Sequence, residues 1–438
     1  MERTEAVGYA DDTYLISIHN STKGTCENIQ ADHDICLAWA ERHGAKFAPE
    51  KYKLMHFTRK TRLSSEQNRM PGIASLTGLP EQSMRVLGVT IDKKLNWKAH
   101  IENAVIKAKR AEAAIRRITA ATWGASLDRG RHLYIAMARP AMMYGCECWM
   151  AGQKVARTLI QQLETAQNRI LRLISGAYKA TRTQLLRWEL KVEDITTYAR
   201  RRVSTTMASQ QTPRVREIYA RLRARIQRKC EQLGSFQRYK GRPYQAPLQH
   251  AEKEVTRQLH QLSPTPGVWG KKEAKKAIQD RLEIQYHLAQ KLNWESSEMG
   301  RRPFALQPPW EDKSKWRYKG LSKAQAAILI QARTEAIGLP AFLYRRKVPN
   351  ASPRCSCGEI GTVRHYLAFC REKSAQRREL AQDTGTTDAR RWLNEYPGKA
   401  ATWMIRNLPL AQFSWTIQHM PDMLTSEEGR GEGRLRGA

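Results

Sequence analysis

The feature that most constrains the fold is a pair of adjacent aspartates, Asp11 and Asp12, between two short apolar segments. Residues 6–10 and 13–18 have the length and apolar content of β-strands, and two such runs around two turn-forming residues predict a tight hairpin. Adjacent carboxylates repel each other without a cation. The two Mg²⁺ ions of a phosphoryl-transfer site would supply one. An exposed turn rich in aspartate is the alternative, since aspartate is common in turns.

The charge of the chain indicates its partner. Lys plus Arg number 75 and Asp plus Glu number 42, which gives a formal net charge of +33 over 438 residues. Residues 1–50 are acidic on balance, whereas residues 51–350 are strongly basic. A charge this large calls for a polyanion, and nucleic acid is the first expectation. The pattern is typical of a metal-binding acidic site beside a phosphate-binding surface.

Secretion and membrane insertion are not expected. Residues 1–5 lack the basic-then-apolar order of a signal peptide. No apolar run approaches the ~20 residues that a membrane helix needs. We therefore expect an intracellular and nuclear protein, whose eight cysteines are free thiols or metal ligands rather than disulfides.

One group of cysteine and histidine residues has the spacing of a metal site. Cys355, Cys357, His365 and Cys370 form the pattern C-x-C-x7-H-x4-C. Three thiolates and one imidazole match the closed tetrahedral ligand set of structural zinc. We predict that these four residues bind Zn²⁺, and the alternative is a set of packed or free cysteines.

Basic side chains follow a long helical pattern that begins near residue 100. They lie mostly outside its apolar stripe, and a second group occurs around residue 200. Phosphate contacts of this kind give affinity with steep salt dependence and little sequence recognition. Solvated helix faces are the alternative for any single cluster. The predicted nucleic-acid contacts are Lys107, Lys109, Arg110, Arg116, Arg117, Arg200, Arg201 and Arg202.

Tryptophans offer a second kind of nucleic-acid contact, because exposed indole rings can stack on bases. The candidates are Trp123, Trp149, Trp188 and Trp269. Packing in a core or an interface is favoured for each of them.

The aspartate hairpin resembles motif C of reverse transcriptases, in which Tyr-Ala-Asp-Asp stands between apolar strands. Residues 44–57 resemble motif D of the non-LTR (LINE-type) retrotransposon polymerases, and Lys51 falls where that motif carries its lysine. Residues 86–101 resemble the segment that leads from palm to thumb, and residues 139–147 resemble a later thumb segment. Residues 320–372 resemble the cysteine–histidine segment of LINE proteins together with its helical lead-in.

This resemblance implies an α+β, mostly α fold. It implies a partial polymerase palm made of a β-hairpin with a helix and strands. The residue pattern itself predicts strands at residues 53–58 and 85–91. A helical thumb, helical linker regions and a small zinc-binding module would follow. The implied boundaries are 1–98 for the partial palm with motifs C, D and E-like, 99–210 for the thumb, 211–319 for the basic linker, 320–375 for the lead-in and CCHC zinc segment, and 376–438 for a C-terminal helical segment with a disordered tail.

The resemblance also implies a function. The family is an RNA-directed DNA polymerase that copies RNA into DNA from a nicked chromosomal end, with RNA and DNA as template and primer. Asp11 and Asp12 would be Mg²⁺ ligands. Lys51 would lie near the incoming nucleotide as an acid or a charge stabiliser.

The same resemblance predicts an incomplete site. The family uses a further catalytic aspartate on a strand upstream of motif C, where its fingers also lie, and here motif C begins close to Met1. We therefore expect the chain alone to be inactive, with an unknown partner as the source of any missing palm and fingers. Two alternatives stay open, namely a non-catalytic, zinc-containing nucleic-acid-binding protein and a degenerate transposon remnant.

Overall fold

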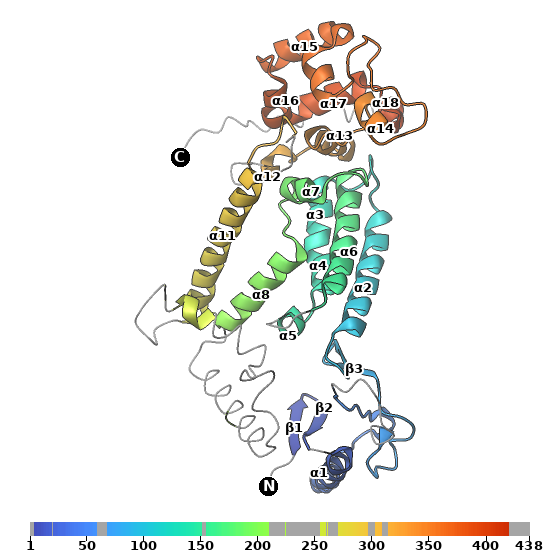
Figure 1. Cartoon of the computed structure of the whole chain (residues 1–438), viewed down its shortest axis with the longest axis vertical. Helices are drawn as coiled ribbons and strands as arrows, with labels where there is room; N and C mark the ends of the chain where they lie inside the picture. The colour runs from blue at the N-terminus through green and yellow to red at the C-terminus, as the bar shows by residue number, and fades with distance from the viewer. Residues whose placement is uncertain are drawn as a thin grey trace. The chain divides into compact units, whose positions relative to one another are not determined.

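The structure is a computed structural model that describes residues 4–19, 21–58, 68–150, 155–209, 224, 255–259, 261, 270–296, 303–308 and 314–419. These residues are mostly helical, as the sequence predicts, and they include two small antiparallel sheets of two strands each (Figure 1). The chain divides into two compact units. The first contains Met1–Asn103, Gly145–Leu159 and Arg202–Ile278, and the second contains Ala104–Tyr144, Ile160–Arg201 and Gln279–Ala438.

The first sheet is the predicted aspartate hairpin. Strand β1 (Thr4–Tyr9) pairs antiparallel with β2 (Asp12–Ser17). The two turn residues are therefore Ala10 and Asp11, and Asp12 is already the first residue of the second strand. Ala10 has a φ of 54°, the left-handed conformation that tight two-residue turns require. The hairpin is confirmed, with its turn one residue earlier than predicted.

Helix α1 (Thr22–Arg42) follows the hairpin and packs against one of its faces. The Asn28 side-chain amide donates a hydrogen bond to Ser17 Oγ at 3.3 Å. Successive side chains of a strand point to opposite faces, so Leu15 shares the face of Ser17. Asp12 lies on the other face.

The strand predicted for residues 53–58 is wrong. Isolated hydrogen bonds hold this segment, since Glu81 N–H donates to Leu54 O at 2.7 Å and Thr58 N–H donates to Lys93 O at 3.1 Å. A strand needs a continuous ladder along a partner, and the described residues provide none here.

The strand predicted for residues 85–91 is instead a second hairpin. Strand β3 (Ser83–Val86) pairs antiparallel with β4 (Val89–Asp92). The turn residues Leu87 and Gly88 have φ values of 47° and 86°. Positive φ at both central residues defines a two-residue turn whose twist matches that of the two strands. The prediction that residues 85–91 are extended is therefore correct, but the chain reverses direction at the centre of this run.

The other helical segments confirm a mostly α chain. The apolar stripe of α2 is buried as predicted, with Ile101 at 0% and Ile115 at 1% exposure. Most of the predicted linker 211–319 and the tail from residue 420 lie outside the described residues. The bounds are η1 Pro49–Lys51, α2 Lys98–Arg116, α3 Leu127–Leu133, η3 Tyr134–Ala138, α4 Arg139–Met142, α5 Cys146–Trp149, α6 Arg157–Ser175, α7 Thr183–Leu190, α8 Ile195–Ser209, α11 Lys271–Ser296, α12 Ser314–Arg317, α13 Lys323–Arg333, α14 Pro340–Arg345, η4 His365–Phe369, η5 Arg371–Lys373, α15 Ser374–Thr384, α16 Ala389–Glu395, α17 Pro397–Asn407, η6 Ala411–Phe413 and α18 Ser414–His419.

A buried ion pair joins α7 to α13 inside the second unit. Arg333 donates from Nε to Glu189 Oε2 at 3.0 Å and from its terminal nitrogen to Oε1 at 2.9 Å. Arg317 lies 3.7 Å from the same carboxylate, and the Tyr318 hydroxyl donates to it. Burial alone would raise the pKa of Glu189, but Arg333 and then Arg317 outweigh it and lower that pKa. The carboxylate therefore stays charged in the core.

Replacing Glu189 by Gln should lower the free energy of unfolding by about 3–5 kcal/mol, because Arg333 would remain as a buried charge without its partner. Urea denaturation measures this change. The matched control is Glu395→Gln, which breaks an exposed ion pair with Arg391 and should leave the unfolding free energy close to that of the wild type. Equal losses in the two variants would contradict the assigned role of the buried pair.

The loss of unfolding free energy caused by Glu189→Gln should also depend on pH. Folding lowers the pKa of Glu189 from its ordinary value of 4.5, so the carboxylate contributes stability that is present above that pH. This contribution is lost as the pH falls through the folded-state pKa. The difference between the wild type and Glu189→Gln should therefore narrow below pH 4.5, and a difference that widens on acidification would contradict the assignment.

Candidate metal centre and nucleic-acid interface

The first half of the predicted zinc pattern lies on a tight turn. Cys355 N–H donates to Glu359 O at 2.7 Å, and Gly358 N–H donates to Cys355 O at 2.9 Å. Arg354 and Ile360 form an antiparallel bridge, so the chain doubles back on itself. Gly358 has a φ of 92°, which a side chain would strain. The glycine thus permits the turn that holds the C-x-C pair.

The second half of the pattern lies on the π-helical turn η4. Cys370 follows this turn, and its N–H donates to His365 O at 2.8 Å. The sulfur atoms of Cys355 and Cys370 are 3.8 Å apart, and Cys357 Sγ lies 3.2 Å from His365 Nε2. All four ligand atoms lie within 4.8 Å of one another. Zn–S bonds of about 2.3 Å in a tetrahedron place two sulfur atoms about 3.8 Å apart, so this donor set fits Zn²⁺.

Hydrogen bonds prepare one of these thiols for metal binding. Burial raises the pKa of Cys355, but hydrogen bonds from Tyr366, the Cys357 backbone and neighbouring side chains outweigh it and lower the pKa to about 6. This thiol is therefore ionised at neutral pH, which is the form that binds metals. Burial raises the pKa of Cys370, so metal binding would displace its proton.

The cysteines outside this group have a different character. Cys26, Cys36, Cys146 and Cys148 are free thiols, which agrees with the expectation for these four. Burial, followed by the Glu147 charge, raises the pKa of Cys146 to about 12. A thiol of this kind is inert at neutral pH. Cys230 lies outside the described residues.

Both predicted Mg²⁺ ligands are exposed on the aspartate hairpin. The Tyr14 hydroxyl donates to Asp12 Oδ2 at 3.1 Å. Burial and then this hydrogen bond raise the pKa of Tyr14, which keeps the hydroxyl protonated as a donor. Adjacent accessible carboxylates suit Mg²⁺, which prefers oxygen ligands. Among the described residues, no third acidic or histidine side chain joins Asp11 and Asp12 in a metal-ligating group.

Lys51 ends the short turn η1, and its side chain is exposed. Among the described residues, no hydrogen bond or ion pair joins it to Asp11 or Asp12. Its role near an incoming nucleotide stays a prediction.

The hairpin face that carries Asp12 is open to solvent. The cross-strand pairs Tyr9 with Asp12 and Val7 with Tyr14 place these residues on one face, opposite the face that contacts α1. Tyr9 is 64% exposed and Val7 is 46% exposed. The carboxylates therefore stand beside an uncovered apolar surface.

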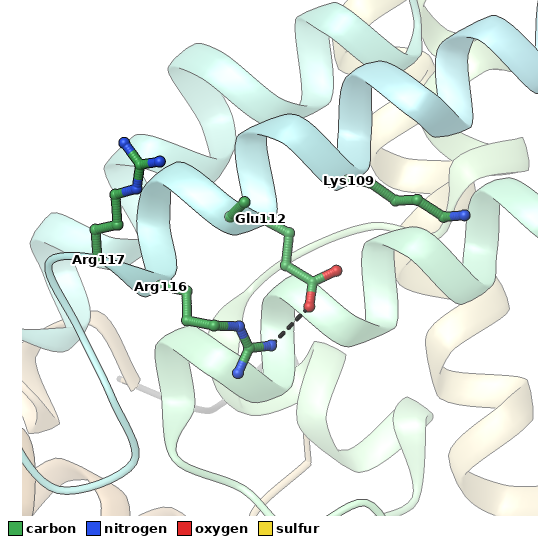
Figure 2. A pocket seen from close by; sticks show the side chains of 5 residues that line it. Lys109, Glu112, Arg116 and Arg117 are labelled. Atoms are coloured by element: carbon green, nitrogen blue, oxygen red, sulfur yellow. Dashed lines mark hydrogen bonds and ion pairs between the residues drawn. The ribbon is translucent and has the colours of Figure 1, made fainter.

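The basic side chains of α2 face solvent, as a nucleic-acid interface requires. Lys109, Arg116 and Arg117 line a hollow of about 340 Å³ together with Glu112, whose carboxylate pairs with Arg116 at 2.8 Å (Figure 2). Arg110 on the same helix is also exposed. This face carries more cationic than acidic groups.

Lys107 and the cations of α8 have neighbours of their own. Lys107 lies 5.8 Å from the ring centre of Tyr144. Arg201 pairs with Glu193 at 2.6 Å, and Arg202 pairs with Glu147 at 2.6 Å. Phosphates would have to compete with these ion pairs. Arg200 is exposed.

Two supporting residues of the zinc pattern were missed from the sequence. Tyr366 hydrogen-bonds the Cys355 thiol, and Arg377 donates to Cys370 O at 2.5 Å. An aromatic residue directly after His365 was an available signal for the first. Arg377 carried no signal, because a single arginine in a basic chain has many possible roles.

The chain is similar to RNA-directed DNA polymerases of mobile elements. It is 27% identical over 187 residues to the RNA-directed DNA polymerase from mobile element jockey of Drosophila melanogaster, which covers 42% of this chain and 19% of that protein. It is 26% identical over 194 residues to the protein of the same name from Drosophila funebris, which covers 43% of this chain and 20% of that protein. The resemblance to retrotransposon reverse transcriptases is thereby confirmed.

The chain spans about a fifth of the length of the curated relatives it matches. No family model and no solved structure matches it. None of the described helices is both long and apolar enough to span a bilayer.

Replacing Cys357 by Ser should reduce bound zinc from one equivalent to well below half, because one of the four ligand atoms is lost. It should also destabilise residues 320–372, since a structural zinc site contributes its binding energy to folding. Elemental analysis and hydrogen exchange measure the two effects.

The control for that experiment is Cys148→Ser, which removes an exposed thiol outside the zinc pattern and should leave the zinc content unchanged. Zinc stoichiometry that is the same in Cys357→Ser and the wild type would refute the site.

Proposed function

We propose that this chain is the C-terminal part of an RNA-directed DNA polymerase of a non-LTR retrotransposon. In this proposal residues 1–98 belong to the palm, 99–210 to the thumb, 211–319 to a basic linker and 320–375 to the zinc segment. Support comes from matching segments that follow one another in the family's order, and from the similarity to mobile-element polymerases.

The observation that carries the proposal is the hairpin itself. The sequence Tyr-Ala-Asp-Asp forms a two-stranded turn that exposes Asp11 and Asp12 side by side. Bound Mg²⁺ would activate a primer hydroxyl and stabilise the leaving pyrophosphate. This chain would supply two of the carboxylates that bind the metal ions. Its Lys51 would place positive charge near the nucleotide phosphates.

We further propose that the isolated chain is inactive as a polymerase. A two-metal site of this kind uses a further carboxylate, and the described residues bring none to Asp11 and Asp12. The exposed apolar face beside Asp12 is consistent with a palm that another polypeptide segment completes. The complete enzyme would act in the nucleus, where the chromosomal primer lies.

The remaining segments of the chain would bind nucleic acid and stabilise the fold. The exposed cations of α2 suit the phosphates of a template–primer, and the net charge of +33 supports this role for the chain as a whole. The proposed Zn²⁺ would act first as a structural staple, because all four donors are turned inward on one another. Contact of the same segment with nucleic acid is compatible with that role.

The second candidate is a non-catalytic nucleic-acid-binding protein made of the same parts. The lack of a third carboxylate beside the hairpin, among the described residues, favours it for the isolated chain. The two candidates differ in one respect, namely whether Asp11 matters for metal-dependent chemistry.

An extension assay tests the proposed inactivity of the isolated chain, and a positive result would eliminate the second candidate. The isolated chain with an RNA template, a DNA primer, deoxynucleotides and Mg²⁺ should give no product, because its metal site is incomplete. Asp11→Ala should leave the dissociation constant for the template–primer unchanged. Metal-dependent extension that Asp11→Ala abolishes would contradict the proposed inactivity and eliminate the non-catalytic candidate.

Raising the salt from 50 to 200 mM should weaken RNA binding by roughly 10³–10⁵-fold, as expected for about 6–10 phosphate contacts. Titration at several salt concentrations measures the slope of log K against log salt. Lys109→Gln combined with Arg117→Gln should lower that slope by about 1 for each lost contact. Arg201→Gln is the matched control with a smaller effect, because its guanidinium is paired with Glu193. A flat salt response would remove the basic-surface argument.

A further inference from the structure

The loop between α2 and α3 is a rigid hairpin. Thr119 and Gly124 form an antiparallel bridge, and Ala125 N–H donates to Ile118 O at 3.0 Å. Ala120 N–H donates to the carbonyl oxygen of Trp123 at 2.9 Å. The backbone around Trp123 is therefore fixed by hydrogen bonds on both sides of the turn.

Two glycines show how tightly the loop is seated. Gly124 has a φ of 94°, and a Cβ atom there would lie 2.3 Å from Ile118 O. A Cβ atom on Gly176, which follows α6, would lie 2.4 Å from Ala121 O. The loop thus packs directly on the end of α6, and Thr119 at its base is fully buried.

This rigid loop presents apolar side chains to solvent. Trp123 is 46% exposed and Ile118 is 49% exposed. Two other tryptophans with the same predicted choice of roles, Trp149 and Trp188, are buried at 0% and 7% exposure. Core packing is therefore the role of those two, and Trp269 lies outside the described residues. Trp123 instead lies half exposed on a loop whose backbone is held by hydrogen bonds.

Cationic groups lie at the start of this loop and along the end of α2. Arg117 is the first residue of the loop, Arg116 ends α2, and Lys109 lies about two turns earlier on the same helix (Figure 2). Glu112 partly neutralises Arg116, which leaves a positive balance around the hollow. An aromatic ring beside a cationic groove is the usual combination for binding single-stranded nucleic acid, because bases stack while phosphates bind the cations.

We propose that Trp123 is a stacking platform for an unpaired base of a bound nucleic acid, with Ile118 as its apolar flank and Lys109, Arg116 and Arg117 on the neighbouring phosphates. This inference rests on the proposed nucleic-acid binding of the chain, and adds to it a preference for single strands. A duplex hides the faces of its bases, so it would gain the phosphate contacts without the stacking.

The test compares two labelled probes, a single-stranded 20-mer RNA and the same sequence in a duplex, by fluorescence anisotropy with the full chain. Trp123→Ala should weaken single-strand binding by roughly 5- to 150-fold, the range expected for one stacked base. It should change duplex binding by less than about 3-fold, and it should leave the salt slope unchanged, because no phosphate contact is lost.

Two variants serve as controls. Trp123→Phe retains a stacking ring and should restore single-strand binding to within about 3-fold of the wild type. Trp39→Ala removes an indole of similar exposure, 48%, from α1 and should have no effect. Photo-crosslinking of a 4-thiouridine RNA, followed by mass spectrometry, should place the adduct on residues 117–124 in the wild type.

The outcomes distinguish this inference from the proposal beneath it. A wild-type chain that binds neither probe defeats the proposed nucleic-acid function. Salt-sensitive RNA binding that Trp123→Ala leaves unchanged overturns the stacking platform alone. An equal loss on both probes overturns it as well, because it would show a general structural effect.

Discussion

The second unit depends on the ion pair between Glu189 and Arg333. Both side chains are fully buried, and their bidentate contact connects α7 to the end of α13, in which residues 326–330 are all buried. Arg333 also donates to Ala305 O at 3.2 Å, so the same guanidinium holds the segment before α12. A buried charge is tolerable only when its partners are in place, and this requirement restricts how the helices can pack. The turn that carries the zinc pattern follows this core along the chain, and Ala341 N–H at the start of α14 donates to Gly361 O beside that turn at 3.2 Å.

Local features were predictable from the sequence, and distant contacts were not. The aspartate hairpin could be predicted because two apolar runs around two turn residues are sufficient to specify a hairpin locally. The zinc pattern could be predicted because its ligands fall within a short span whose turn and helix bring them together. Residues 53–58 have the composition of a strand but lack a ladder partner, which no local pattern reveals. Glu189 and Arg333 are separated by 144 residues, so their contact had no signal in spacing.

The candidate sites show the same difference between features that the local sequence specifies and features that depend on distant contacts. Asp11 and Asp12 are placed by their hairpin, and the four predicted zinc ligands are placed by their own turns. The roles of the basic residues required the structure, because Arg201 and Arg202 form internal ion pairs while Arg110 and Arg117 face solvent. Trp123 and Trp149 are equivalent in the sequence, yet one is exposed and the other is in the core. Exposure depends on what packs against a residue, and this information is spread over the whole chain.

We infer that Asp11 and Asp12 are two carboxylates of a polymerase site that an upstream segment of the same polypeptide completes. The most direct measurement is the sequence of the transcript upstream of the codon for Met1. We expect an open reading frame that encodes a further strand with an aspartate for the same metal site. An in-frame stop codon immediately upstream would contradict it, because the site could then not be completed within one polypeptide.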